Sequence, residues 1–272
     1  MTFQSARSPY LNRRRALGIF SGAIASAVIV GCSNDETKDV STTAQTDSTT
    51  PTETTIESST STANESCTLI PEETAGPYPG DGSNGPDVLQ IDGVVRSDIR
   101  SSIGSASGVA DGLELQVELT ILDSASACAP LAGAAVYLWH ADSQGRYSMY
   151  SSGVENENYL RGVQVADDQG ILTFTTIHPG CYDGRWPHIH FEVYRTLDDI
   201  AAGNLLATSQ LAFPAESCAE VYDVVGYETS QANFGRADLS RDMVFSDGVD
   251  QQLATMSGSD NSGLTASLSV TV

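Results

Sequence analysis

The chain has 272 residues, with 13 basic and 35 acidic side chains, and its formal net charge is −22. A charge of that sign argues against binding nucleic acid or an anionic surface through bulk electrostatics, so an anionic ligand would need a local arginine. Residues 67–272 are enough for one domain with a substantial core.

The first 31 residues have the order of a secretory signal. They hold no acidic residue, and three consecutive arginines beginning at Arg13 precede an apolar run that is short for a permanent membrane span. The run ends in a lipobox at residues 29–32, where cleavage would expose the Cys32 thiol for attachment of diacylglycerol. Residues 12–17 also resemble a twin-arginine export signal, with a plain signal as the alternative. We therefore expect an exported protein, lipid-anchored on the outer face of the cytoplasmic membrane.

Residues 32–66 are mostly Ser, Thr, Asp and Glu, with almost no apolar side chains to bury. Such a segment cannot offset its own ordering entropy, so we expect the lipidated cysteine to be followed by a disordered linker. The linker would hold a folded domain, residues 67–272, away from the membrane surface.

Four cysteines lie in the predicted domain: Cys67, Cys128, Cys181 and Cys218. In an exported domain this number indicates two disulfides, for which three pairings are possible. A structural zinc site is the alternative, and the absence of any C-x-x-C pair disfavours it.

Apolar and polar residues alternate over much of the domain, most clearly at residues 113–119. A period of two is typical of a strand with one face in water. The other predicted strands cover residues 135–140, 162–166, 171–177, 188–194, 205–213 and 266–272. A turn at 167–170 favours a hairpin over residues 162–177. Only a short helix is expected, near 217–224, so the many short strands predict an all-β sandwich or barrel.

Two of the four histidines, His188 and His190, lie two residues apart in a predicted strand. On a strand they project from the same face, close enough to share a metal, although such a pair alone is more often ordinary strand sequence. Upstream, the Pro-Gly pair at 179–180 forms a turn that presents Tyr182. Tyr159 precedes another predicted strand, and from the residues alone it is interpreted as an exposed loop aromatic.

Several motifs resemble the intradiol ring-cleavage dioxygenases in order and spacing. The matching segments read Glu73-Thr-Ala-Gly-Pro-Tyr78, Val136-Tyr-Leu-Trp-His-Ala-Asp142, Tyr159-Leu-Arg-Gly, Pro179-Gly-x-Tyr182 and Arg185-x-x-His188-x-His190. The resemblance extends from residue 67 to about residue 213 and is closest to the exported, single-domain branch of the family. It implies a β-sandwich core and a non-haem iron(III) ion held by two tyrosinates and two imidazoles, namely Tyr159, Tyr182, His188 and His190.

These ligand types suit that metal. Two anionic oxygens stabilise iron(III) over iron(II), and a trivalent cation lowers the tyrosine pKa from about 10 so that the phenolate persists at neutral pH. By resemblance, the enzyme would use dioxygen to cleave a catechol-type aromatic diol between its hydroxylated carbons, giving a cis,cis-muconate-type diacid. Catechol, protocatechuate, hydroxyquinol and chlorinated or lignin-derived diols are all candidate substrates.

The resemblance also assigns roles around the metal. Tyr182 would leave the metal and accept a proton from the substrate, Arg185 would stabilise developing negative charge, and Gln210 matches a pocket glutamine. The segment that lines the substrate cavity corresponds to Gly76, Pro77 and Tyr78. The other two histidines, His140 and His178, are interpreted as structural or supporting residues.

Two features depart from the cytosolic members of the family. Cys181 immediately precedes a predicted ligand, and a disulfide to Cys218, with Cys67 paired to Cys128, would stiffen the site. The linker occupies the place of an N-terminal helical dimerisation segment, so the dimer made through that segment is not expected.

Two other interpretations fit parts of the sequence. A non-catalytic extracellular β-sandwich could bind a ligand or wall polymer and retain the motif, but the presence of all four ligand types and Arg185 disfavours it. A copper or zinc site could use His188 and His190 with other ligands, although two tyrosinates would be unusual for zinc. Charge transfer from tyrosinate to iron(III) would colour the protein red to brown, which separates these alternatives.

Overall fold

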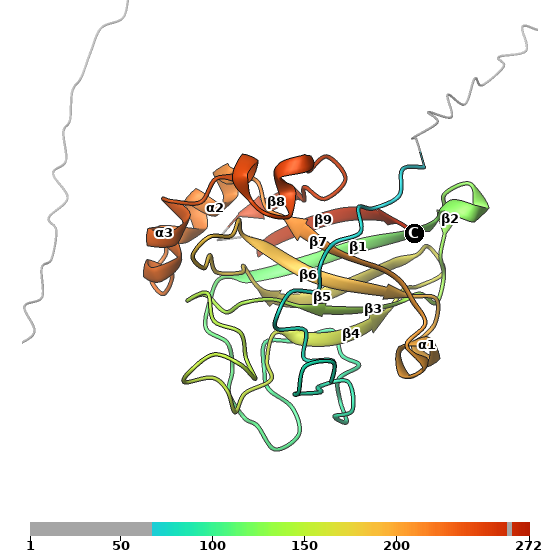
Figure 1. Ribbon diagram of the computed structural model, residues 1–272, viewed down its shortest axis with the longest axis horizontal. Helices are drawn as coiled ribbons and strands as arrows, with labels where there is room; N and C mark the ends of the chain where they lie inside the picture. The colour runs from blue at the N-terminus through green and yellow to red at the C-terminus, as the bar shows by residue number, and fades with distance from the viewer. Residues whose placement is uncertain (1–66, 260–262) are drawn as a thin grey trace, which may run out of the picture. The chain divides into compact units, whose positions relative to one another are not determined.

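The computed structural model describes residues 67–259 and 263–272, which form a β-sandwich of two sheets (Figure 1). One sheet has the order β2-β1-β9-β8, with β5 also paired to β1. Its strands are β1 (Glu114–Asp123), β2 (Ala129–Pro130), β5 (Ile171–Ile177), β8 (Thr255–Ser259) and β9 (Gly263–Thr271). The other sheet has the order β4-β3-β6-β7, formed by β4 (Arg161–Val165), β3 (Ala135–Trp139), β6 (His188–Tyr194) and β7 (Leu205–Ala212).

Short helices connect and flank the strands. The α-helices are α1 (Leu197–Ala202), α2 (Ala215–Tyr222) and α3 (Glu228–Phe234), and the 3-10 helices are Ser124–Ser126, Leu239–Arg241 and Phe245–Asp247. In Figure 1, α2 and α3 lie at one end of the sandwich and α1 lies near the other. None of the helices in the described part of the chain is long and apolar enough to cross a membrane. The predicted signal, the lipidated Cys32 and the linker at 32–66 lie outside the described residues, so they stay predictions.

The main core lies between the sheets, as strand alternation requires. On β1, Leu115, Val117, Leu119 and Ile121 are fully buried, whereas the residues between them are partly exposed. They pack in one cluster with the inward-facing residues of β6, among them Phe191. Burying these apolar side chains provides the main driving force for the fold.

The four-stranded sheet is covered on its outer face as well. All residues of β3 and β6 are buried, and a second cluster on the outer face joins Tyr137 and Trp139 to loop residues such as Val88. Because the inner face is filled by apolar core, polar groups in these buried strands must lie on the outer face. Polar side chains on the outer face of β6 are therefore shielded from solvent.

The predicted strands are present, but the predicted hairpin over 162–177 is wrong. Its turn exists, with the amide of Ile171 donating to Oδ1 of Asp167 at 2.9 Å. However, β4 pairs with β3, whereas β5 pairs with β1 over seven residue positions, so the turn carries the chain from one sheet to the other. The sequence analysis also did not identify α1, α3, β2 or β8.

The cysteines form one disulfide in the described residues. Cys67 is bonded to Cys128, which closes a loop of 61 residues. The expected second bond is wrong, because Cys181 and Cys218 are both free and buried. Sγ of Cys181 donates to the backbone carbonyl of Arg185 at 3.5 Å, so its thiol is satisfied within its own turn.

Candidate metal centre

Strand β6 presents His188 and His190 on the outer face of the four-stranded sheet, and each is 3% exposed. Nδ1 of His188 donates to the carbonyl of Trp186 at 2.5 Å, which leaves its Nε2 with a free lone pair. The ring of Trp139, the register partner of His190 on β3, stacks on that imidazole at 5.0 Å between centroids. The two Nε2 atoms face each other at 3.2 Å.

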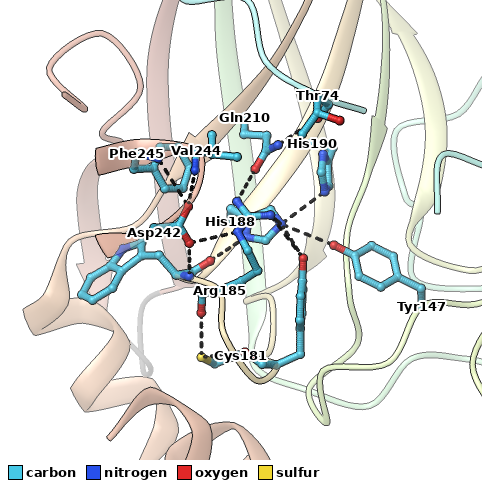
Figure 2. Close-up of polar contacts among 12 residues, drawn as sticks. Thr74, Tyr147, Cys181, Arg185, His188, His190, Gln210, Asp242, Val244 and Phe245 are labelled. Atoms are coloured by element: carbon cyan, nitrogen blue, oxygen red, sulfur yellow. Dashed lines mark hydrogen bonds and ion pairs between the residues drawn. The ribbon is translucent and has the colours of Figure 1, made fainter. Parts of the chain in front are cut away.

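Two tyrosine hydroxyls lie close to the same imidazole. The hydroxyl of Tyr182 lies 3.2 Å from Nε2 of His188. The hydroxyl of Tyr147 lies 3.5 Å from the same atom (Figure 2). Tyr182 comes from the turn before β6, whereas Tyr147 comes from the loop between β3 and β4. Two phenol oxygens and two imidazole nitrogens therefore converge from three segments of the chain.

The surroundings keep all four groups neutral when no cation is near. Burial lowers the pKa of His188 to about 3, with a further contribution from Arg185. Burial and the neighbouring His188 hold the pKa of His190 well below its ordinary value. Burial also raises the pKa of both Tyr147 and Tyr182. Neutral imidazoles are ready ligands, whereas these phenols need a strongly positive ion to ionise.

A metal at this point would have to use the phenol oxygens. Among residues 67–259 and 263–272, no three His, Cys, Asp or Glu side chains gather in a way that could hold a metal ion. The two histidines alone are too few for a stable site, so the tyrosines must complete the set. Two hard anionic oxygens with two imidazoles fit iron(III) better than zinc or copper(I).

Tyr159, which was expected among the ligands, does not lie in this cluster. Its hydroxyl donates to Oδ2 of Asp142 at 3.3 Å, a carboxylate already held by Arg146. Its ring packs with an apolar cluster that includes Val154 and Leu160, away from the histidines. Leu160, the next residue, has a φ of +57°, and this turn gives the Tyr159 side chain a direction that spacing along the sequence does not reveal.

Tyr147 is the member of this cluster that the sequence analysis did not identify. It is 2% exposed, and it follows a tight turn in which Asp142 and Arg146 exchange hydrogen bonds. Gly145 in that turn has a φ of +79°, and a Cβ there would lie 3.0 Å from the carbonyl oxygen of Cys181. The signal was the Gly-Arg-Tyr-Ser sequence at 145–148, which follows the Trp-His-Ala-Asp motif with two residues between them.

Arg185 lies beside the cluster and is held by two partners. Its Nε donates to Oδ2 of Asp242 at 2.9 Å, and its Nη2 donates to Oε1 of Gln210 at 2.7 Å. Its Nη1 lies 3.4 Å from the Tyr182 hydroxyl and 3.4 Å from Nε2 of His188. The guanidinium is therefore fixed where it can act on negative charge at the Tyr182 side of the cluster (Figure 2).

Asp242 was not identified from the sequence, although it is 3% exposed and central to this network. Oδ2 also accepts from the amide of Trp186 at 2.6 Å, and Oδ1 accepts from the amides of Val244 and Phe245. Burial alone would raise the pKa of Asp242, but the hydrogen bonds from Arg185 and these amides outweigh it and the net shift is downward. Asp242 therefore stays ionised as the counter-ion of Arg185.

A cavity of about 560 Å³ opens beside the cluster. Its lining includes the three residues expected there, Gly76, Pro77 and Tyr78, together with Tyr147, Tyr182 and Arg185. Its size falls in the range of roughly 300–1,000 Å³ that is typical of small-molecule sites.

Gly76 lets the lining segment approach the metal cluster closely. Its φ is +69°, and a Cβ on it would lie 3.3 Å from Cε1 of His190. Gln210 joins the same segment to the sheet, because its Nε2 donates to the carbonyl of Thr74 at 2.9 Å.

The other two histidines have structural contacts. Nε2 of His140 bonds Oγ1 of Thr176 at 2.7 Å, and Nδ1 of His178 donates to the carbonyl of Pro179 at 3.1 Å. Both are buried outside the tyrosine–histidine cluster.

Comparison with known proteins shows which family this chain is similar to. A family model described as Dioxygenase matches residues 96–198, a range that contains the whole tyrosine–histidine cluster. An intradiol ring-cleavage dioxygenase from Tetranychus urticae is 26% identical, with a TM-score of 0.60, over 75% of this chain and 94% of its own. A second dioxygenase crystal structure gives 26% identity and a TM-score of 0.59, with 75% of this chain and 94% of that chain covered.

The dioxygenase domain of a carbohydrate-binding fusion protein from Streptomyces sp. SirexAA-E is 24% identical, with a TM-score of 0.49, over 75% of this chain and 98% of that one. The family match and the two structures of higher TM-score agree with the motifs and with the sandwich that carries them. In its matched segment, its sandwich fold and its motifs, the chain is similar to the intradiol ring-cleavage dioxygenases, which are oxidoreductases.

Proposed function

We propose that the chain is a non-haem iron(III) enzyme that cleaves a catechol-type diol between its hydroxylated carbons with dioxygen, giving a cis,cis-muconate-type diacid. The observation that carries the proposal is the convergence of two phenol oxygens and two imidazole nitrogens beside an open cavity. The proposed ligands are Tyr147, Tyr182, His188 and His190, with Tyr147 replacing Tyr159. When bound, the metal supplies the positive charge that holds the diol oxygens as anions next to dioxygen.

The residues around the cavity have distinct proposed tasks. Tyr182 lines the cavity and lies against Arg185, so its phenolate oxygen is placed to accept a proton from a diol hydroxyl. Arg185 then faces the negative charge that develops there, with its orientation set by Asp242 and Gln210. A preorganised cation in a buried site stabilises such charge by several kcal/mol, on the order of 10²–10³ in rate.

Substitution of single tyrosines tests the ligand set. We expect the iron-loaded wild-type protein to show a visible charge-transfer band, and Tyr147→Phe and Tyr182→Phe each to lose most of the band and of the bound iron. Tyr159→Phe is the matched control, because that hydroxyl is bonded to Asp142 instead. Loss of colour in Tyr159→Phe with full colour in Tyr147→Phe would overturn the assignment.

The products test the reaction. Incubation with a panel of catechols should give cis,cis-muconate-type diacids without added reductant, with one dioxygen consumed per diol and label from heavy dioxygen in the carboxylates. A yellow semialdehyde would show cleavage outside the diol and would refute the mechanism even with every ligand correct.

We also propose that the enzyme is exported and held at the membrane by lipid on Cys32. The support is the order of basic, apolar and small residues that ends in the lipobox at 29–32. Cys32→Ser should release the protein from the membrane fraction of the expressing cell, and unchanged membrane association would contradict the anchor.

A further inference from the structure

Among the residues that line the cavity beside the tyrosine–histidine cluster, only Arg185 has a cationic side chain. A carboxylate on the ring of a bound diol would therefore have one cationic side chain available at the cavity wall. Whether the carboxylate can pair with that side chain decides which diols bind.

The guanidinium of Arg185 already forms hydrogen bonds to other residues. Its Nε is bonded to Asp242, whose side chain is 1% exposed, and its Nη2 is bonded to Gln210. Its Nη1 is directed at the Tyr182 hydroxyl and His188. These four contacts leave one of the five N–H donors, so a substrate carboxylate could form a two-bond pair with this guanidinium only by displacing a partner. Displacement of Asp242 would leave a buried carboxylate without its counter-ion.

Two other arginines cannot replace it. Arg146 is paired with Asp142, and Arg161 is fully buried. The Nε and Nη2 of Arg161 donate to Ser148, and its Nη1 donates to the carbonyl of Pro79 behind the cavity wall. The field of the whole domain is also unfavourable for an anion. Residues 67–272 contain eight arginines and no lysine against 28 acidic residues, so an approaching carboxylate is repelled before it reaches the cavity.

The lining offers apolar and aromatic surface instead. The ring centroids of Tyr78 and Tyr147 lie 5.0 Å apart, and these two rings line the cavity together with Pro77. Tyr150 packs against Tyr78, with 5.2 Å between their ring centroids. Met243 completes the lining and is 78% exposed, so it lies where the cavity meets solvent. Such a surface gains free energy from an uncharged ring substituent and gives a carboxylate no partner.

We propose that this site selects uncharged diols, such as catechols with alkyl or halogen substituents, over diols that carry a carboxylate on the ring. The proposal rests on the proposed function and narrows its substrate class. Tyr78 and Met243 would contact the substituent, and the absence of a free cation in the lining would exclude the carboxylate.

Matched substrates test the selection. We expect kcat/KM for 4-methylcatechol to exceed that for protocatechuate by about 100-fold or more, because an unpaired carboxylate would have to be desolvated. Met243→Arg places a free cation at the cavity mouth and should reduce this ratio at least tenfold relative to Met243→Gln, the neutral control of similar length. A wild-type preference for protocatechuate, or equal ratios in the two variants, would overturn the proposal.

A binding measurement separates this inference from the proposed function. Calorimetric titration of the protein with two unreactive monophenols, 4-methylphenol and 4-hydroxybenzoate, should show at least tenfold tighter binding of 4-methylphenol. Equal or tighter binding of 4-hydroxybenzoate, or no binding of either, would overturn the selection. If no diol is cleaved, the proposed function fails, and the order of the two monophenols still decides the inference.

Discussion

Replacing Asp242 with Asn should weaken both the fold and the reaction. The carboxylate is the buried counter-ion of Arg185 and also accepts hydrogen bonds from three backbone amides. Asparagine has nearly the same shape but loses the charge and one acceptor. The guanidinium of Arg185, whose side chain is 10% exposed, is then left without an ionic partner.

The expected loss of stability follows from the burial of this ion pair. Removing one partner of a buried ion pair costs about 3–5 kcal/mol in the free energy of unfolding, because the remaining charge stays desolvated. Arg185 should also lose its fixed position beside the Tyr182 hydroxyl, 3.4 Å away. A displacement of this kind lowers the rate by about tenfold to 100-fold. Iron content should be nearly unchanged, since the Asp242 carboxylate bonds to Arg185 and to backbone amides and to none of the proposed ligands (Figure 2).

The assay compares Asp242→Asn with Asp238→Asn. Asp238 lies four residues away and is paired with Arg241, but the two side chains are 48% and 85% exposed, so its loss should cost no more than about 1 kcal/mol. Urea unfolding, iron content and kcat at a temperature where both variants are fully folded give the three readouts. The same unfolding free energy and kcat in the two variants would refute the positioning role of Asp242.

Three further predictions concern rate, pH and covalent structure. Arg185→Ala should leave most of the iron in place and lower kcat about 100-fold, whereas a parallel loss of iron would make this arginine structural. Burial lowers the pKa of His140 to about 4 and of His188 to about 3, so below pH 6.5 the unfolded chain binds protons that the folded chain does not. The free energy of unfolding of the metal-free protein should therefore fall by about 1 kcal/mol per buried histidine between pH 7 and pH 5.5, and an unchanged urea midpoint would contradict this. Replacing Cys67 and Cys128 with Ser should lower the free energy of unfolding by up to about 4 kcal/mol, because the disulfide closes a loop of 61 residues; calorimetry that shows no change would mean that the bond does not constrain the unfolded chain.

The strands could be predicted where the apolar period was strong. Residues 171–177 and 188–194 were predicted with the bounds that β5 and β6 have in the structure. Pairing could not be predicted in the same way, because a turn such as 167–170 serves equally to join two strands of one sheet or to cross between two sheets. Here β5 pairs with β1 over seven residue positions, and this pairing is more favourable than a hairpin with the neighbouring strand β4.

The types of side chain in the cluster were easier to predict than which tyrosines belong to it. A pair of histidines at i and i+2 on a strand must share a face, so the common direction of His188 and His190 followed from local geometry. Their assignment as ligands rested on the resemblance. Tyr147 and Tyr159 both lie in the loop that joins β3 to β4, and the sequence does not reveal which ring faces the sheet. Left-handed backbone conformations at Gly145 and Leu160 set the directions of the two tyrosine side chains. Of these two residues, only the glycine is of a type that signals such a turn in a sequence.

The least predictable residues are those that couple the cluster to distant segments. Asp242 reaches Arg185 across 57 positions in the sequence, and Gln210 joins Arg185 to the carbonyl of Thr74 across the outer face of the sheet. Through Gln210, the segment that carries Gly76 is bonded to the guanidinium beside the proposed ligands. Moving this wall of the cavity outward would therefore break a hydrogen bond that orients Arg185, so cavity shape and charge stabilisation are properties of one connected network.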